Sequence, residues 1–412
     1  MAELDQGPSL APPNAEARAL LKRPDLLDCF LETSVRHGCV GEDTNKKLLY
    51  LAFTSRKLKK PISVVVKGES ASGKSCQALT ISKFFPPKDM LDLSGMSAKA
   101  LLHYKDPLEH KVLLIMEHAG AEAAEYAIRT LQSEGRLDYL VTTQVAPGQF
   151  VSERKHVEGP VSFIVTTNRS ELDGQNENRC FTIYADESEE QTKSIHEAQR
   201  VGYLGTQAVN SSELDVWRCA QQLLEPKPVL IPYADLIEFP TKPLRVRRDH
   251  PRFLSLIETS AFLHQHQRHT ITLGQTEYIE ATVDDYRTAH NLAVGLLPAL
   301  IEALPPMSEK LVEQAQANCQ GTTFTVKHLE GWLKWDRKTV YKYVGEAVKA
   351  GHIEVASSGL GVPTRYRLNP DKPYERGRLL LLSPEELMEK IEQRRLSKQS
   401  RPEEMAHGQV NP

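Results

Sequence analysis

Short apolar runs alternate with helical patterns of apolar residues through the first half of the chain. Two segments, residues 137–141 and 150–157, alternate apolar and polar positions about Pro147-Gly148, which is typical of a β-hairpin. Strands that alternate with helices favour a mostly parallel sheet with helices on both faces, so the predicted fold class is α/β. The expected buried strands are residues 62–66, 90–93, 112–116, 161–165 and 180–184.

The same pattern divides the chain into regions. Residues 1–22 are rich in proline, alanine and acidic residues, so we expect a flexible arm there. The α/β core is expected over residues 23–210, followed by a mainly helical lid over residues 211–306 in which Arg252 opens one helix. Residues 307–370 are expected to form a helix-turn-helix with two short strands, and residues 371–412 a final helix and a polar tail.

One loop between a predicted strand and a predicted helix has a specific phosphate-binding pattern. Residues 68–75 satisfy the spacing G-x-x-x-x-G-K-[ST] of a P-loop. We expect the N–H groups of the loop and the positive end of the following helix to bind the phosphates of ATP. Lys74 is expected to reach the β- and γ-phosphates, and the Ser75 hydroxyl is expected to bind Mg²⁺. The predicted nucleotide-binding residues are Gly68, Glu69, Ser70, Ala71, Ser72, Gly73, Lys74, Ser75 and Cys76.

Hydrolysis of the nucleotide also requires polar groups beside the P-loop. Glu117 follows the strand at residues 112–116 and is expected either to polarise the attacking water, with the metal-side carboxylate missing, or to bind the metal itself. We prefer the first role because Met116 extends the strand naturally. Asn168 ends the next apolar strand and is expected to orient the same water, although an asparagine after a strand is also a common turn residue.

Two arginines are candidates for contacts with the γ-phosphate. Arg179 follows a polar loop and is expected either to act on a neighbouring subunit's nucleotide as an arginine finger or to form a surface ion pair. Arg252 is expected to fold back from the helical region onto the phosphate. Arg245, Arg247 and Arg248 compete for that role.

Composition limits how this chain contacts nucleic acids. With 51 basic and 54 acidic residues the formal net charge is −3, so any contact must come from local basic patches. In the predicted hairpin, Arg154 and Lys155 are candidates to grip DNA phosphates if the protein forms a ring with a central channel. At the start of the second helix of the helix-turn-helix, Arg337, Lys338 and Lys342 favour DNA binding, although such modules also dock proteins.

The cysteines and the apolar segments bear on the cellular compartment. The six cysteines are scattered without a C-x-x-C pair, which favours free thiols in a reducing cytoplasm. No apolar run approaches the roughly 18 residues that span a bilayer, and the start of the chain lacks the pattern of a signal peptide. We therefore expect a cytoplasmic protein with no membrane partner.

The order of these motifs along the chain resembles that of a known family. The chain is similar to the AAA+ motor of minichromosome-maintenance (MCM)-like helicases, and most of all to primase-associated and helicase-like ATPases of bacterial mobile elements and phages. The resemblance covers roughly residues 25–370. It implies a P-loop AAA+ core, a helical lid and a C-terminal winged helix. The residues that carry it are the P-loop, the strand before Glu117, the hairpin, Thr166-Thr167-Asn168, Asn178-Arg179-Cys180-Phe181-Thr182-Ile183 and Asp186-Glu187-Ser188.

The resemblance also implies a function. The family implies an ATP-fuelled ring, commonly hexameric, that translocates on DNA, with Arg179 as the arginine finger and Arg252 as the sensor-2 arginine. Met116 stands where the family has a Walker B aspartate, which weakens the expectation of fast hydrolysis. No zinc-binding or oligonucleotide-binding domain precedes the motor, so we expect a separate partner such as a primase.

These observations favour an ATP-dependent DNA helicase or translocase that acts in replication of a mobile element or phage. The alternative, from a different class, is a nucleotide-switched DNA-binding loader or regulator with slow ATP hydrolysis, which Met116 favours. A winged-helix regulator with an idle ATPase core is less compatible with a complete P-loop.

Overall fold

The structure is a computed structural model of the 412-residue chain. The chain divides into two compact units, which we call unit 1 (residues 1–296 and 382–412) and unit 2 (residues 297–381). The chain therefore leaves unit 1 once and later returns to it. The structure describes residues 15–97, 100–104, 106–116, 125–146, 149–168, 179–204, 211–241, 246–297, 304, 306–319, 322–359, 362–370, 372, 374 and 380–406.

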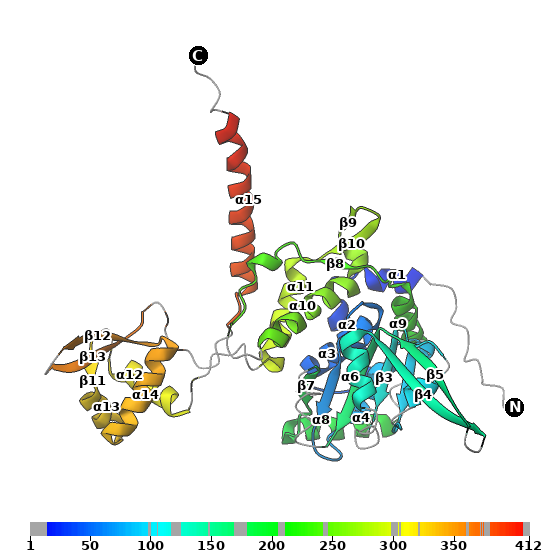
Figure 1. The fold of residues 1–412 in the computed structure, drawn as a ribbon, viewed down its shortest axis with the longest axis horizontal. Coiled ribbons are helices and arrows are strands. Elements are labelled where there is room, and N and C mark those ends of the chain that lie inside the picture. The colour runs from blue at the N-terminus through cyan, green and yellow to red at the C-terminus, as the bar shows by residue number, and fades with distance from the viewer. Residues whose placement is uncertain are drawn as a thin grey trace. The chain divides into compact units, whose positions relative to one another are not determined.

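A five-stranded sheet forms the centre of unit 1 (Figure 1). Its strand order is β2-β3-β6-β1-β7, and every neighbouring pair is parallel. All seven residues of β6 are buried, as expected for a strand covered on both faces. The predicted α/β fold with a mostly parallel sheet is therefore confirmed. The strands are β1 (Val64–Lys67), β2 (Met90–Leu93), β3 (Lys111–Ile115), β6 (Val161–Thr167) and β7 (Phe181–Tyr184).

Helices and a hairpin cover both faces of this sheet. On one face, Leu113 and Phe163 pack in a cluster with Leu131 of α6 (Glu125–Glu134). On the other face, the Ser162 hydroxyl donates a hydrogen bond to the Ala52 carbonyl of α3 (Asp43–Thr54) at 3.0 Å. The predicted hairpin is present and extends away from the sheet (Figure 1). Its strands are β4 (Arg136–Ala146) and β5 (Gln149–Glu158), and the core also contains α4 (Lys74–Ser82) and α5 (Ala100–His103).

The helices at the start of the chain pack onto the core. α1 (Ala15–Leu21) contacts α9 (Ser211–Leu223), and α2 (Leu26–Arg36) supplies Phe30, whose ring stacks on Tyr50 at 4.2 Å between centroids. Ala17 and Leu21 are buried because they lie four residues apart on one face of α1. The prediction of a flexible arm over residues 1–22 is therefore wrong for residues 15–21, while residues 1–14 lie outside the described part.

The region after α8 (Glu189–Tyr203) and α9 is not only helical. α10 (Val246–Leu263) and α11 (Val283–Leu296) are accompanied by a three-stranded sheet in the order β8-β10-β9. The predicted start of a helix at Arg252 is wrong, because α10 begins at Val246 and continues through Pro251. A proline that usually marks a helix boundary thus lies inside this helix. The strands that the sequence analysis missed are β8 (Val229–Leu230), β9 (Thr270–Leu273) and β10 (Thr276–Glu280).

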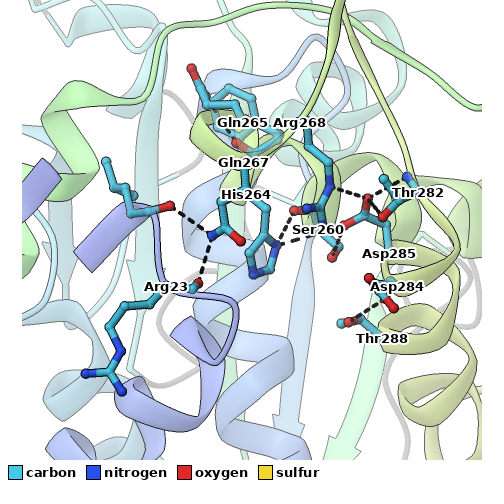
Figure 2. Close-up of polar contacts among 12 residues, drawn as sticks. Arg23, Ser260, His264, Gln265, Gln267, Arg268, Thr282, Asp284, Asp285 and Thr288 are labelled. Carbon is cyan, nitrogen blue, oxygen red and sulfur yellow. Dashed lines mark hydrogen bonds and ion pairs between the residues drawn. The ribbon is translucent and has the colours of Figure 1, made fainter. Parts of the chain in front are cut away.

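A buried polar network fastens α10 to α11 (Figure 2). The Asp285 carboxylate accepts hydrogen bonds from Nε and Nη2 of Arg268, both at 2.8 Å, and from the Ser260 hydroxyl at 2.8 Å. The Thr282 backbone N–H donates to the same carboxylate at 2.9 Å. A buried carboxylate is costly unless its oxygens are paired, so these bonds allow Asp285 to lie fully inside unit 1.

Unit 2 builds its own small core. Leu311, Phe324 and Val340 are fully buried there, and its three strands form an antiparallel sheet in the order β11-β13-β12. The helices and strands predicted for residues 322–368 are present. The elements are α12 (Pro306–Asn318), β11 (Phe324–Thr325), α13 (Val326–Leu333), α14 (Arg337–Ala350), β12 (Ile353–Gly359) and β13 (Val362–Leu368).

The last helix, α15 (Pro384–Ala406), belongs to unit 1. Arg287 of α11 forms an ion pair with Glu385 at 2.6 Å, and Arg394 forms one with Asp235 at 2.7 Å. These pairs hold the first turns of α15 against α11 and the segment around Asp235. Among the helices in the described ranges, none combines the length and the apolar character needed to cross a membrane.

Candidate functional site

The predicted P-loop joins the carboxyl end of β1 to the start of α4. Gly73 has a φ of +89°, which glycine adopts without strain, and it directly precedes the helix that begins at Lys74. A Cβ atom on Gly68 would lie 2.7 Å from Ser72 Oγ and 3.0 Å from Ala185 Cβ, so the loop has room only for glycine at this point. The loop brings its backbone and the first turn of α4 together, which suits an anionic ligand.

Lys74 lies against its own loop. Its Nζ atom donates hydrogen bonds to the Gly68 carbonyl at 2.8 Å, to the Ser72 hydroxyl at 3.2 Å and to the Glu69 carbonyl. Ser75, the next residue, is exposed on the first turn of α4. A lysine, a hydroxyl group and a glycine-shaped cradle are thus present together, and these groups fit ATP with Mg²⁺.

Asn168 lies at the same edge of the sheet as the P-loop. β6 and β1 pair in parallel with Thr167 opposite Lys67, so Asn168 and Gly68 are the next residues on adjacent strands. Neighbouring strands are about 4.8 Å apart. Asn168 is exposed there. The structure therefore brings Asn168 beside the start of the loop.

The end of β3 lies one strand further from β1. The Met116 backbone N–H donates to the Leu93 carbonyl at 3.1 Å, and the Thr166 hydroxyl donates to the Met116 carbonyl. These bonds fix the end of β3 at the carboxyl edge of the sheet. Glu117 lies outside the described residues, so both roles considered for it stay predictions.

Glu187, to which the sequence analysis assigned no role, lies at the P-loop. Glu187 Oε1 accepts a hydrogen bond from the Glu69 backbone N–H at 2.6 Å. The turn between β7 and α8 directs it there, because the Ala185 N–H donates to the Lys67 carbonyl at 2.8 Å and Ser188 caps α8. The acidic turn was visible in the sequence, but the pairing of β7 with β1 was not, and that pairing brings Glu187 to the loop.

The segment around the start of α3 borders the same turn. Asn45 Nδ2 donates hydrogen bonds to Glu42 Oε2 at 2.7 Å and to the Tyr184 carbonyl at 2.8 Å. Gln191 Nε2 donates to the Val40 carbonyl at 2.8 Å. Burial raises the pKa of the Glu42 carboxyl. Residues 40–45 therefore contact the end of β7 and the start of α8, a packing that the sequence analysis also missed.

Arg179 lies at the opposite edge of the sheet from the P-loop. It comes just before β7, whose first residue, Phe181, pairs with Val64 at the start of β1. Its Nε atom donates to the Ser133 hydroxyl at the end of α6, at 2.9 Å. At about 3.3 Å per residue, the length of β1 separates this edge from the P-loop by about 10 Å. The arginine thus lies away from the P-loop of its own chain.

Arg252 lies at the same amino edge as Arg179. Its Nη1 atom donates to Asp249 at 2.9 Å, its Nη2 atom donates to the Cys180 carbonyl, and its Cζ atom is 4.3 Å from the centre of the Phe181 ring. Only 12% of the side chain is exposed. The expected approach of Arg252 to the phosphate of its own chain is not observed, because α10 holds the guanidinium against the start of β7. Of the competing arginines, Arg247 and Arg248 are exposed on α10, and Arg245 lies outside the described residues.

Arg154 and Lys155 point to opposite faces of the hairpin, because successive side chains of a strand alternate. Arg154 Nη2 lies 2.9 Å from Asp138 Oδ1 on the outer face, and 74% of the Arg154 side chain is exposed. Hydrogen bonds from His156 and Arg154 lower the pKa of the Asp138 carboxyl. Lys155 lies on the core-facing side and pairs with Glu153 at 2.7 Å. The two predicted residues therefore cannot grip one phosphate from the same face.

The three basic residues predicted to bind DNA on α14 lie in its first two turns. Asp336 caps the helix, because its Oδ1 atom accepts hydrogen bonds from the backbone N–H groups of Lys338 at 3.0 Å and Thr339 at 3.1 Å. Arg337, Lys338 and Lys342 are all exposed. These three predicted DNA-binding residues thus lie exposed in the first half of a capped helix in unit 2.

Comparisons with known proteins add to this geometry. A family model described as the MTBMA_p00010 P-loop domain matches residues 11–224, just over half of the 412-residue chain. Among solved structures, a full-length MCM homolog from Methanopyrus kandleri is similar with a TM-score of 0.45 and 15% sequence identity, over 71% of this chain and 63% of that chain. The chain thus spans less than two thirds of that homolog. No curated protein matches. The family match includes the P-loop, Asn168 and Arg179.

Proposed function

Because the chain belongs to the MTBMA_p00010 P-loop domain family, we propose that it is an ATP-dependent DNA helicase or translocase. Its proposed setting is the cytoplasm, in replication of a mobile element or phage, with a separate primase as partner. The motif order of the sequence supports this reading, because the P-loop, the Asn168 strand and Arg179 follow one another as in MCM-like AAA+ motors.

The observation that carries the proposal is the division of the candidate residues between two edges of one sheet. The P-loop and Asn168 lie at the carboxyl edge, and Arg179 lies at the amino edge. Arg179 would therefore act on the nucleotide of a neighbouring copy of the chain. A ring of identical subunits, with six as the proposed number, would bring every such pair of edges together. Arg252 is then a residue that braces the start of β7.

The chain's own residues have defined tasks in this mechanism. Lys74 binds the β- and γ-phosphates, Ser75 holds Mg²⁺, and the loop N–H groups bind the remaining phosphate oxygens. ATP with Mg²⁺ supplies the phosphoanhydride bond whose hydrolysis drives movement. Asn168 orients the attacking water, Glu117 polarises it, and Arg179 stabilises charge at the phosphate.

DNA is proposed to contact both units. On unit 1, Arg154 on the outer face of the hairpin is the leading candidate, and Lys155 on the other face is secondary. On unit 2, α13 and α14 are proposed to be the helix-turn-helix of a winged helix, with Arg337, Lys338 and Lys342 on the recognition helix. The exposure of these cations on a capped helix supports that assignment.

Steady-state ATP hydrolysis with and without DNA tests this proposal, together with unwinding of a forked duplex. We expect DNA to stimulate hydrolysis, the fork to be unwound, and Lys74→Ala to abolish both activities. Particle size measured with ATP and DNA tests the ring. Unchanged turnover in purified Lys74→Ala would discard the motor assignment.

A second function is favoured by Met116. This residue directly follows β3, at the place where the resembling family carries an aspartate, so slow hydrolysis is the expectation if no other carboxylate compensates. The chain would then be a nucleotide-switched DNA-binding loader or regulator. ATP-dependent DNA binding without unwinding of the forked duplex would favour this alternative.

A further inference from the structure

Helix α14 has one buried face and one cationic face. Val340, Val344 and Ala347 are buried in the core of unit 2. Tyr341 lies on the other side with 47% of its residue surface exposed, and the Arg337 Cζ atom is 5.8 Å from the centre of its ring. The exposed cations of the helix are Arg337, Lys338, Lys342 and Lys349.

Gly345 lies in the middle of the cationic face. Helix positions three and four residues apart are neighbours, so Gly345 lies beside Tyr341, Lys342 and Lys349. A Cβ atom built on Gly345 would meet no heavy atom of the structure within 4 Å. Packing among the described residues therefore does not require glycine at this position.

Helix stability does not require this glycine either. Glycine is less favourable than alanine in a helix interior. Gly345 is not a cap, because α14 begins after Asp336 and ends at Gly351, which has a φ of +85°. Gly345 therefore weakens α14 and has no role in packing or capping among the described residues. This combination indicates that the glycine is needed for contact with another molecule.

We propose that the missing side chain at Gly345 leaves a gap on the surface of α14, which we call the notch. This gap lets the sugar–phosphate backbone of a DNA duplex approach the main chain of the helix. The inference rests on the proposed DNA-binding role of unit 2 and names the point of closest approach. Glycine is suited to this task because it leaves room for a ligand next to the backbone. Lys342 and Lys349 lie beside Gly345 and would each pair with a phosphate.

The charges on this face favour a polyanion over a protein surface. The only carboxylate beside Gly345 in the sequence belongs to Glu346, and its Oε2 atom accepts a hydrogen bond from the Ser308 hydroxyl of α12 at 2.7 Å. That bond directs Glu346 toward the interior of unit 2. The exposed stripe around Gly345 therefore presents cations and one aromatic ring, which matches the backbone of DNA.

The test is Gly345→Ala in the full chain, measured by two independent readouts. Thermal unfolding should show a midpoint raised by a few degrees, because alanine favours the helix. DNA binding is measured by fluorescence anisotropy with a short labelled duplex of mixed sequence, without nucleotide and at fixed salt. The dissociation constant should rise about tenfold, because the added methyl group would cost one close charged contact between a phosphate and Lys342 or Lys349. Higher stability combined with weaker DNA binding is the expected signature.

Two further variants separate the notch from the proposed interface. Gly202→Ala in α8 is the matched control, because a Cβ atom there also meets nothing within 4 Å, and DNA binding should not change. The double variant Lys338→Ala with Lys342→Ala should weaken DNA binding and reduce its salt dependence.

The outcomes distinguish failure of the notch from failure of the interface. Normal DNA binding by Gly345→Ala, together with weak binding by the double lysine variant, overturns the notch and leaves the interface. Normal binding by all variants overturns the interface as well. A lowered unfolding midpoint in Gly345→Ala also overturns the notch, because glycine would then serve internal packing.

Discussion

The carboxylate of Glu187 accepts a hydrogen bond from the backbone N–H of Glu69, with 2.6 Å between Glu187 Oε1 and the Glu69 nitrogen. The carbonyl of Glu69 accepts hydrogen bonds from the Ser72 N–H at 3.3 Å and from Lys74 Nζ. The N–H of Glu69 is thus held by a carboxylate, and the carbonyl of the same residue is held by the lysine that the phosphates would need. The hydrogen bonds with Glu187 and Lys74 therefore hold the P-loop in a closed conformation.

Replacement of Glu187 by alanine should strengthen nucleotide binding. A hydrogen bond to a charged group is worth about 1.5–3 kcal/mol. If this bond must break when the loop opens, Glu187→Ala should lower the dissociation constant for a non-hydrolysable ATP analogue about tenfold. Removal of a negative charge beside the phosphates acts in the same direction. Isothermal titration calorimetry measures the change.

Two controls accompany this measurement. Glu190→Ala removes the same charge from the exposed first turn of α8, and it should have little effect because surface charges are screened. Glu187→Gln keeps an oxygen acceptor without the charge and should fall between the wild type and Glu187→Ala. Weaker binding in Glu187→Ala would show that the carboxylate supports the bound nucleotide.

The position of Arg179 predicts complementation between inactive subunits. Arg179→Ala should bind ATP normally but lose turnover, because the guanidinium lies at the amino edge of the sheet, away from its own P-loop. Lys74→Ala should lose turnover through the P-loop itself. Mixed in one ring, the two variants create some interfaces with an intact P-loop and an intact arginine, so ATP hydrolysis should partly return. A mixture that stays inactive while still forming rings argues against a shared site.

The P-loop carries a natural reporter of nucleotide binding. Cys76 is exposed on the first turn of α4, whereas burial raises the pKa of the Cys39 thiol to about 12, which keeps that cysteine unreactive. N-ethylmaleimide should therefore modify Cys76 rapidly, and ATP with Mg²⁺ should slow the reaction at least several-fold by covering the helix start. Mass spectrometry of the digested protein follows the modification. The fast phase should vanish in Cys76→Ala; an unchanged rate with saturating ATP would place the nucleotide elsewhere.

Local patterns were enough to predict the P-loop and the strands of the central sheet. The spacing of Gly68 and Gly73 and the apolar runs are properties of short segments, and the structure keeps them nearly unchanged. The β9–β10 hairpin was missed because most of its residues are exposed, so the apolar alternation that marks a half-buried strand is weak there.

Other errors concern contacts between distant segments. Nothing local to Glu187 shows that β7 pairs with β1, and this pairing alone brings the carboxylate to Glu69. Arg252 was expected at the phosphate, but the packing of α10 sets its guanidinium against Cys180 and Phe181. Tertiary packing, which a single sequence does not display, decides which edge of the sheet each side chain reaches.

His264 should make the stability of unit 1 depend on pH. It lies buried between α10 and the network around Asp285, and its Nδ1–H donates to the Ser260 carbonyl at 2.8 Å (Figure 2). Burial lowers the pKa of His264 below its usual value of 6.5, and the cation Arg268 acts in the same direction. The unfolded chain therefore binds a proton more readily than the folded chain.

Urea unfolding at neutral and mildly acidic pH measures this effect. Because the folded-state pKa is the lower one, the contribution of His264 to the free energy of unfolding is complete above pH 6.5 and is lost as the pH falls through and below that value. One proton gives a slope of at most about 1.4 kcal/mol per pH unit.

His264→Gln retains a donor for Ser260 but does not titrate, so its stability should fall less steeply with acid than that of the wild type. Burial also lowers the pKa of His37, which is why the comparison is between variant and wild type and not between two pH values alone. Equal slopes for the two proteins would mean that His264 accepts its proton inside folded unit 1 without cost.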